Sequence, residues 1–196
     1  LLRTYYYVGG MPAAVNAYLP RQSLTAARRV QIRLISDYEQ DFSKHAPASV
    51  ISRIRMVWNG IPSQLAKENY SVLREGARAK DFELAIQWLI DCGLCYKVGR
   101  VTKGGIPLKA YQDLPAFKLY LVDVGLLAAM TDLDAKTLLR GNAIFTEFKG
   151  ALTEQYVCQQ LVSDLTAVPY YWSAESSSGE VDFVLQHGGN VIPLEV

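Results

Sequence analysis

The chain is poor in cysteine, in net charge and in long apolar runs, and each shortage excludes a class of protein. Its 196 residues include three cysteines, too few for the disulfide framework of a small secreted domain. Its longest apolar run, residues 119–130, is broken by Asp123 and Gly125 and is shorter than the ~20 residues that a membrane helix needs. We therefore expect a cytoplasmic protein with no membrane partner.

Two sequence signals are also missing. The chain contains no G-x-x-x-x-G-K-[ST] phosphate loop, so we expect it to hydrolyse no nucleoside triphosphate by itself. It opens on Leu1 without the basic and apolar regions of a signal peptide, and it stops at Val196 inside an expected strand. From these two ends we expect a piece of a longer protein.

The net charge of +1 conceals two halves of opposite sign. Residues 1–110 carry 16 Lys and Arg against 8 Asp and Glu, a net +8, whereas residues 111–196 carry 4 against 11, a net −7. Half of the residues are apolar, which permits a packed core and excludes general disorder. The asymmetry suggests nucleic acid as a partner for the basic half, and metal or protein for the acidic half.

Helical spacing dominates the basic half. Pro12 begins one helix, residues 24–38 form another, and Pro47 marks a boundary. Three short helices and a β-hairpin should follow, an order typical of a winged helix-turn-helix. The expected helices are 49–58, stopped by Asn59-Gly60, then 62–67 and 81–92; the expected strands are 94–101 and a segment ending at residues 110–111.

The acidic half has an α+β pattern. A strand over residues 117–122 and a short helix over 125–130 lead to a long helix over 147–162. Three short strands follow, separated by turns rich in Ser and Gly, over residues 168–172, 181–186 and 191–196. The predicted fold class is therefore α+β.

Three carboxylates occupy places where a metal site could form. Glu154 lies in the middle of the long helix, Asp182 on the second of the last three strands, and Glu195 on the third. Mg²⁺ binds oxygen ligands drawn from more than one element, and it activates water for phosphoryl chemistry. The three residues are therefore candidate magnesium ligands and candidate catalytic residues. The alternative is that they are ordinary surface acids at strand ends.

Several segments resemble a known family. The C-terminal part resembles the PD-(D/E)xK, restriction-endonuclease-like fold in the segments GALTE (150–154), YWS (171–173), EVDF (180–183) and IPLEV (192–196). More closely, the chain resembles the C-terminal region of a large prokaryotic family of AAA+-like P-loop ATPases that ends in a domain of unknown function. Further matching segments are VGGMP (8–12), residues 38–44, IPSQL (61–65), GAR (76–78) and FKLYLVDVGLL (117–127).

The resemblance implies three modules. Residues 1–47 would be the helical remnant of an ATPase lid, and residues 48–130 a winged-helix domain. Residues 131–196 would be a PD-(D/E)xK-like α/β domain, truncated at its third strand. The family's ATPase core, with its ATP site, would lie in another part of the intact protein.

The resemblance also implies roles for single residues. Glu154, Asp182 and Glu195 would be the nuclease-type acids that hold Mg²⁺. The Lys that this motif places two residues after Glu195 would lie beyond Val196, so the site is incomplete. Pro12 would be a peripheral nucleotide contact in the intact protein; the alternative is that Pro12 simply begins a helix.

The basic residues of the winged-helix candidate are candidate nucleic-acid contacts, because residues 50–110 hold ten cations against five acids. Cations ahead of the third helix and on the wing would contact phosphates. They are Arg74, Arg78, Lys80, Lys97, Arg100 and Lys103. The third helix carries no Lys or Arg but has Asp81, Glu83 and Asp91, which disfavours the major groove. DNA contact and protein docking therefore both stay open.

The sequence supports one leading hypothesis and two alternatives. The leading hypothesis is a C-terminal part of an AAA+-like ATPase that hydrolyses no ATP and binds nucleic acid or docks a partner. The first alternative is a Mg²⁺-dependent nuclease domain, so whether the chain is an enzyme stays open. The second is a module for protein interaction only. Cys92 and Cys95 are expected to be structural, since no second cysteine pair exists for zinc.

Overall fold

The computed structural model describes residues 1–67, 82–140, 146–164, 167–174 and 179–196, and it has the predicted α+β architecture. The helices are α1 (Leu2–Val8), α2 (Pro12–Tyr18), α3 (Leu24–His45), α4 (Ile51–Lys67), α5 (Glu83–Asp91), α6 (Val124–Met130), α7 (Ala135–Arg140) and α8 (Thr146–Ser163). The strands are β1 (Cys95–Val101), β2 (Gln112–Leu121), β3 (Tyr170–Ser173), β4 (Glu180–His187) and β5 (Asn190–Leu194).

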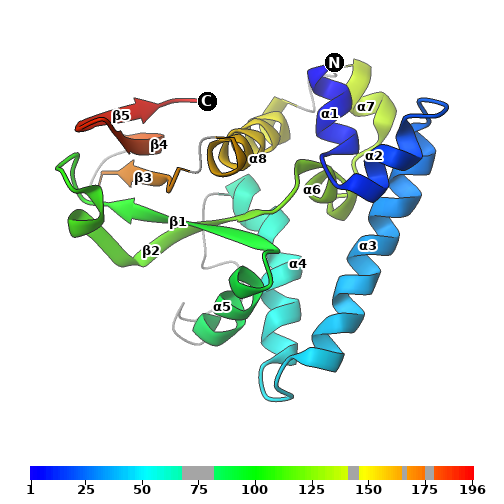
Figure 1. Ribbon diagram of the computed structural model, residues 1–196, viewed down its shortest axis with the longest axis horizontal. Helices are drawn as coiled ribbons and strands as arrows, with labels where there is room; N and C mark the ends of the chain where they lie inside the picture. Colours follow the sequence, from blue (N-terminus) through cyan, green and yellow to red (C-terminus); the bar gives the residue numbers. More distant parts are fainter. Residues whose placement is uncertain (68–81, 141–145, 165–166, 175–178) are drawn as a thin grey trace.

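The strands of the described chain form one mixed sheet in the order β2-β1-β3-β4-β5. β1 and β3 run parallel, whereas the other neighbouring pairs are antiparallel. In Figure 1, α8 lies above the β1–β2 hairpin and α4 and α5 lie below it, while α1, α2, α3, α6 and α7 gather beyond one end of the sheet. The hairpin is therefore covered by helices on both of its faces.

The parallel pairing of β1 with β3 joins two parts that the sequence divides into separate modules. Gly99 lies opposite Tyr170, and Val101 lies opposite Trp172. One large hydrophobic core runs from α1 through the hairpin to β4. The winged-helix candidate and the nuclease-like candidate thus share a sheet and a core, and their division at residue 130 stays a prediction.

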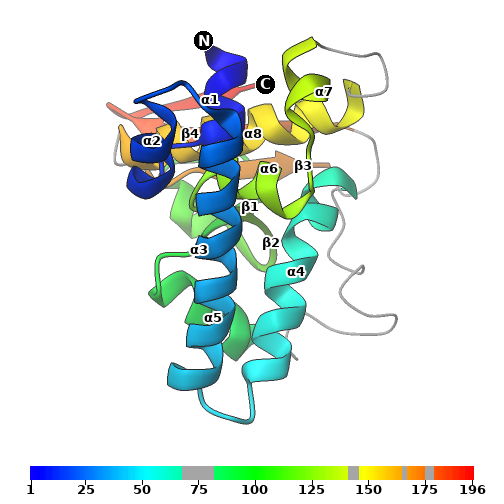
Figure 2. The same cartoon turned by 90° about the vertical axis from the view of Figure 1, so that its right-hand side faces the viewer.

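Helix α4 is longer than the sequence predicts. Asn59-Gly60 does not stop it, and it runs unbroken to Lys67 with Pro62 inside. A proline inside a helix costs roughly 3 kcal/mol. Full burial of the side chains in the turns that lead up to the proline offsets that cost, at roughly 1.5–3 kcal/mol each. The buried residues are Ile54, Val57, Trp58 and Ile61. α4 lies beside α3 (Figure 2), whose Phe42 ring meets that of Trp58 edge to face.

The second strand of the hairpin also differs from its prediction. Residues Leu108–Tyr111 form a 3₁₀-helix, not the end of a strand, and β2 then runs unbroken from Gln112 to Leu121. Leu108 is buried in a small second core with Tyr170 and Val184. The chain turns inward to bury Leu108, so the ladder with β1 begins only after this turn. The wing between the two strands therefore spans residues 102–111.

None of the helices in the described part of the chain is both long enough and apolar enough to cross a bilayer.

Candidate functional site

Lys118, on β2, is the centre of a buried ionic cluster beneath α8. It is 9% exposed. Its Nζ lies 2.9 Å from Glu154 Oε1 on α8 and 2.6 Å from Glu180 Oε1 on β4. Burial by itself lowers the pKa of Lys118, but the two carboxylates outweigh burial and raise this pKa above its ordinary value. The ammonium is therefore charged in the folded protein, and it connects α8 to β2 and β4.

Two tyrosines complete what we call the Lys118 cluster (Lys118, Tyr120, Glu154, Tyr171 and Glu180). The Tyr120 hydroxyl donates a hydrogen bond to Glu154 Oε1. The Tyr171 ring centroid lies 5.2 Å from Lys118 Nζ, within the range of a cation–π contact. Two carboxylates against one ammonium leave the cluster with a net negative charge. Each partner is needed, because a buried charge without its counter-charge costs several kcal/mol.

Asp182 and Glu195 lie at the end of the β4–β5 ladder, close to Glu180 of the Lys118 cluster. Asp182 is on β4, and Glu195 directly follows β5. β4 and β5 pair Phe183 with Leu194, so the next step of the register sets Asp182 opposite Glu195. Asp182 Oδ2 accepts a hydrogen bond of 2.9 Å from the Val196 N–H. Both carboxylates are therefore held near the C-terminal end of the chain.

A β-bulge in β4 includes Asp182 and Phe183. The register between β3 and β4 shifts so that these two residues together oppose Tyr171. Phe183 belongs to the large core with Tyr171. Asp182 follows Glu180, a partner of Lys118, by two residues. Alternation along β4 therefore places Asp182 on the face that carries the Lys118 cluster.

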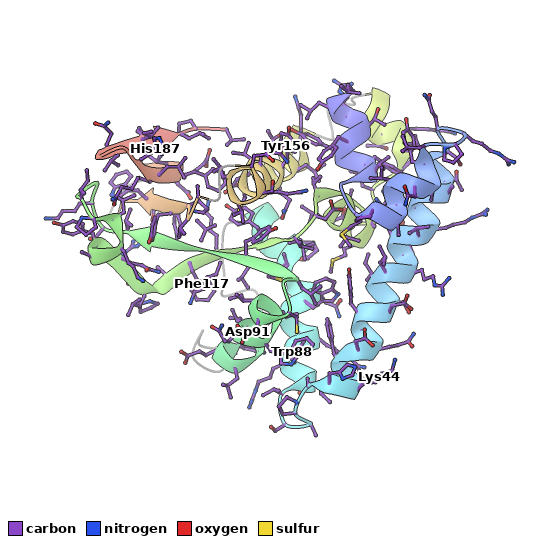
Figure 3. The ribbon with its side chains drawn as sticks, in the orientation of Figure 1. Lys44, Trp88, Asp91, Phe117, Tyr156 and His187 are labelled. Atoms are coloured by element: carbon purple, nitrogen blue, oxygen red, sulfur yellow. The ribbon has the colours of Figure 1, made fainter. Side chains whose placement is uncertain are left out.

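The structure brings the three predicted metal ligands together only in part. Asp182 and Glu195 are neighbours, whereas Glu154 is engaged by Lys118. In the residues described, no group of three or more His, Cys, Asp and Glu side chains is placed to hold a metal ion. Neither histidine adds a metal ligand to these acids. His187 is the last residue of β4, and His45 is the last residue of α3, next to Lys44 (Figure 3). The magnesium site stays a prediction.

Arg100, a predicted DNA contact, is paired within the protein. Its Nη2 lies 2.6 Å from Asp113 Oδ2, and its Nε donates to the same oxygen at 3.1 Å. The two strands of the hairpin set these residues opposite one another. The Arg100 side chain is 17% exposed. Its charge is therefore largely neutralised by Asp113 rather than presented to a phosphate.

Lys97 and Lys103, two further predicted contacts, each lie over an aromatic ring. Lys97 Nζ is 4.4 Å from the centroid of Phe117, and Lys103 Nζ is 4.5 Å from the centroid of Tyr111. Such contacts at exposed sites are worth only about 0.5–1 kcal/mol. Both lysines are exposed. Together with the exposed Lys109, they are the cations of the described β1 strand and wing that could still turn toward a phosphate.

The remaining predicted DNA contacts, Arg74, Arg78 and Lys80, lie outside the described residues. The helix that follows them, α5, is acidic as predicted. Glu83 and Asp91 are exposed on it, and the exposed Gln87 donates a hydrogen bond of 2.7 Å to Asp91 Oδ1. This solvent face of α5 repels a phosphate backbone.

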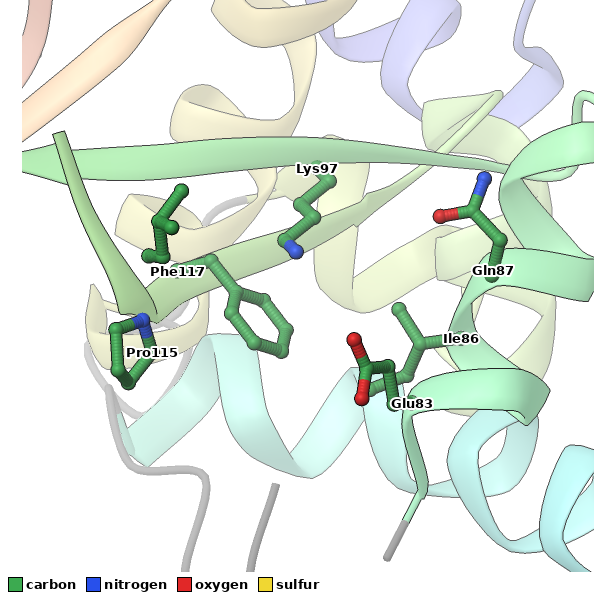
Figure 4. Close-up of a pocket in the computed structure, with 7 residues that line it drawn as sticks. Glu83, Ile86, Gln87, Lys97, Pro115 and Phe117 are labelled. Carbon is green, nitrogen blue, oxygen red and sulfur yellow. The ribbon is translucent and has the colours of Figure 1, made fainter. Parts of the chain in front are cut away.

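A groove between α5 and the hairpin, which we call the α5 groove, has a cavity volume of about 280 Å³. Its lining includes Glu83 and Ile86 from α5, and Lys97, Leu114, Pro115 and Phe117 from the hairpin. The side chains of Glu83 and Lys97 point toward the Phe117 ring (Figure 4). The groove therefore combines an apolar floor with one charge of each sign.

The buried carboxylate of Asp123 connects the turn between α1 and α2 to the start of α6 through hydrogen bonds. Asp123 is 1% exposed; its Oδ2 accepts from the Gly10 N–H at 2.6 Å and its Oδ1 from the Leu126 N–H at 3.0 Å. Burial raises the pKa of Asp123 above its ordinary value, although these N–H groups lower it. Gly9 has φ 71°, and a Cβ there would collide with the Asp123 carboxylate. Only glycine fits this close approach.

Pro12 follows that turn. It is the first residue of α2, as the sequence predicts, and it is exposed. Its role as a nucleotide contact in an intact ATPase stays a prediction.

Sequence reasoning missed Lys118 and Glu180 as cluster members, although one signal was present. In the FKLYLV segment, a period of two places Lys118 and Tyr120 on the face opposite Phe117. A lysine inside an otherwise apolar strand is expected to need a buried counter-charge. The identity of that partner could not be read from the spacing.

Comparison with known proteins gives two family matches. Residues 149–196, which include most of α8 and strands β3 to β5, match a domain of unknown function (DUF4143) that is found in AAA-ATPase-associated proteins. No curated protein and no solved structure matches the chain. Residues 1–137, which include α1 to α6 and the hairpin, match a second domain of unknown function (DUF8612). Because this match covers more than half of the sequence, the chain belongs to the DUF8612 family.

Proposed function

We propose that the chain is a partner-docking module of an AAA-ATPase-associated protein, and that it binds a protein rather than DNA. ATP would be bound and hydrolysed by residues outside this sequence. The match of residues 149–196 to DUF4143 supports the ATPase context. The prediction that the sequence forms the C-terminal region of such an ATPase remains part of this proposal.

The charge distribution around α5 and the wing carries the choice of protein over DNA. Arg100 is neutralised by Asp113, and Lys97 lies over Phe117 inside a groove. The exposed face of α5 presents acids where a DNA-reading helix would present cations. DNA affinity depends on cations aligned with phosphates. The α5 groove, with its apolar floor, instead has the composition of a small protein-binding surface.

Fluorescence anisotropy with a labelled DNA duplex, at low and at physiological salt, tests this choice. At physiological salt we expect no binding tighter than the range of about 10⁻⁴ to 10⁻⁶ M that is typical of non-specific DNA binding, and little gain in affinity as the salt concentration falls. The measurement also covers Arg74, Arg78 and Lys80, because the whole chain is used. The proposal would be wrong if the affinity for DNA rose steeply as the salt concentration falls and if Lys103→Glu weakened this binding. DNA binding would then be the better proposal.

The three cysteines support a cytoplasmic location for this module. Cys92, Cys95 and Cys158 are free thiols. Cys92 is exposed, whereas burial strongly raises the pKa of the Cys95 and Cys158 thiols and keeps them protonated. Unpaired thiols are the usual state in a reducing compartment.

A Mg²⁺-dependent nuclease is a second candidate function, favoured by the position of Asp182 on β4. Asp182 is two residues after Glu180, on the face that holds Glu154, and the end of the β4–β5 ladder brings Glu195 close to it. These are the oxygen ligands that Mg²⁺ prefers. In this proposal Glu154 would have to leave Lys118 in order to reach the metal.

Thermal unfolding with and without Mg²⁺ or Mn²⁺ tests the second candidate. A bound cation should raise the unfolding midpoint in proportion to the logarithm of its concentration above the dissociation constant. Asp182→Ala should abolish that rise, while Asp164→Ala, at an exposed acid on the end of α8, should preserve it. The metal-site proposal would be wrong if the two variants showed equal shifts of the unfolding midpoint, or if the cation did not shift the midpoint of the unaltered chain.

A further inference from the structure

The size of the α5 groove limits its occupant to something small. Its volume of about 280 Å³ is slightly below the roughly 300–1,000 Å³ of sites that enclose cofactors and drug-sized ligands. The groove is therefore too small to enclose a drug-sized ligand fully, whereas it is large enough for one apolar side chain. The groove is open on the solvent side, where the rest of a larger partner could continue.

The groove is apolar where such a side chain would enter. Among its lining residues, Ile86 and Phe117 are buried and form its floor, whereas Leu114 and Pro115 of β2 are exposed to solvent. Leu114 is 73% exposed, which is unusual for a leucine next to a cavity. Covering Leu114 with a partner's side chain would remove apolar surface from water, at roughly 25 cal/mol per Å².

The charges beside the groove favour a particular type of residue next to the apolar side chain of the partner. Glu83 lines the groove, and Asp91 lies on the same exposed face of α5, two turns further on. The cation of the groove, Lys97, has its ammonium over the Phe117 ring. Within the groove, the α5 wall therefore offers the Glu83 carboxylate to an incoming cation, while the hairpin side offers one lysine whose ammonium already contacts a ring.

We infer that the α5 groove binds a protein segment that presents one apolar side chain next to a Lys or Arg. The apolar side chain would lie against Ile86, Leu114 and Phe117, and the basic one would pair with Glu83. This inference rests on the proposed docking function and names the chemistry of the partner.

An NMR titration of the ¹⁵N-labelled chain tests the inference with three synthetic peptides. The probe is acetyl-Ser-Gly-Leu-Arg-Gly-Ser-amide; one control replaces its Leu by Ala, and another replaces its Arg by Glu. Each is added to about 5 mM, because one buried side chain (about 3 kcal/mol) and one exposed ion pair (up to about 1 kcal/mol) together support at best a low-millimolar dissociation constant. We expect the probe to shift the amide signals of Lys97 and Leu114, and each control peptide to bind at least 5-fold more weakly.

Two matched variants locate the binding. Leu114→Glu should weaken the probe at least 5-fold, whereas Leu84→Glu, at a leucine of α5 that is 72% exposed and does not line the groove, should leave its affinity unchanged. Glu83→Lys should remove the preference for Arg over Glu in the peptide. Equal effects of the two leucine variants would overturn the inference, as would a preference for the peptide with Glu.

Self-association is the competing occupant, and the same spectra detect it. If the groove signals shift with the concentration of the chain alone, a second copy occupies the groove and the inference is wrong. If no peptide binds and the DNA titration is also negative, the inferred preference for an apolar residue next to Lys or Arg is wrong, but the proposed docking function is not contradicted. If DNA binds with strong salt dependence, the docking function itself fails.

Discussion

The two faces of the β1–β2 hairpin each place a lysine beside a glutamate and an aromatic ring, but one arrangement is buried and the other is open. On the α8 face, Lys118 has both carboxylate partners within 3 Å and is 9% exposed. On the α5 face, Lys97 is exposed and lies over Phe117, with Glu83 in the same groove. The same residue types thus form a buried ionic cluster on the α8 face and an open, solvent-accessible groove on the α5 face. The difference between the two is the degree of burial.

Lys118→Met should have the largest effect and would break the buried arrangement. It leaves the carboxylates of Glu154 and Glu180 together without a counter-charge, so the free energy of unfolding should fall by about 3–5 kcal/mol. Urea unfolding followed by circular dichroism measures this. A loss below about 1 kcal/mol would mean that the Lys118 cluster is solvated and that the contrast between the faces is unfounded.

Raising the pH should remove the same stabilisation. The pKa of Lys118 is raised in the folded protein above its ordinary value of 10.5. Its contribution is therefore fully present below that pH and is lost as the pH rises through the higher folded value. The stability difference between the unaltered chain and Lys118→Met should stay constant up to pH about 10 and then narrow. A difference that already narrows near neutral pH would contradict a raised pKa.

Tyr120→Phe should have an intermediate effect. It removes the hydroxyl that donates to Glu154, and a hydrogen bond to a charged group is worth about 1.5–3 kcal/mol. Tyr156→Phe is the matched control on α8, because the contacts of Tyr156 with Tyr5 and Tyr6 are made by its ring. We expect the control to change the urea midpoint little; equal losses in both variants would show a general sensitivity of this region.

Lys97→Met should have the smallest effect and would sharpen the comparison. At an exposed position the change in unfolding free energy should stay within about 0.5 kcal/mol. Binding of the Leu-Arg peptide should survive this change, because the inferred contact is with Glu83. A loss of stability comparable to that of Lys118→Met would show that the α5 face is as fixed as the α8 face.

Local patterns in the sequence predicted much of the fold. The long helix expected over residues 147–162 is α8, and the three strands expected after it are β3, β4 and β5. Both predictions rest on periodicity and turn residues, which act over a few neighbours. The prediction failed at Pro62, where local breaking signals were overruled by the burial of a continuous stripe on α4.

The arrangement of the candidate sites depends on distant contacts that periodicity cannot supply. Glu154 was identified from its place on a helix, but its engagement by Lys118 depends on how α8 lies over β2. The partner of Arg100, Asp113, depends on a bulge that shifts the hairpin register between Gly99 and Arg100. Charge counting predicted the same role, contact with DNA, for Lys97, Arg100 and Lys103. Their neighbours in the structure differ, because Arg100 pairs with an acid whereas the two lysines lie over aromatic rings.

The parallel ladder between β1 and β3 bears on where the chain can be divided. The two family matches, residues 1–137 and 149–196, place β1 and β3 in different segments. A protein cut between them would expose the inner edge of β1, and unpaired strand edges invite aggregation. The shared ladder and core lead us to expect that the two segments unfold together, and that either one expressed alone is prone to aggregate.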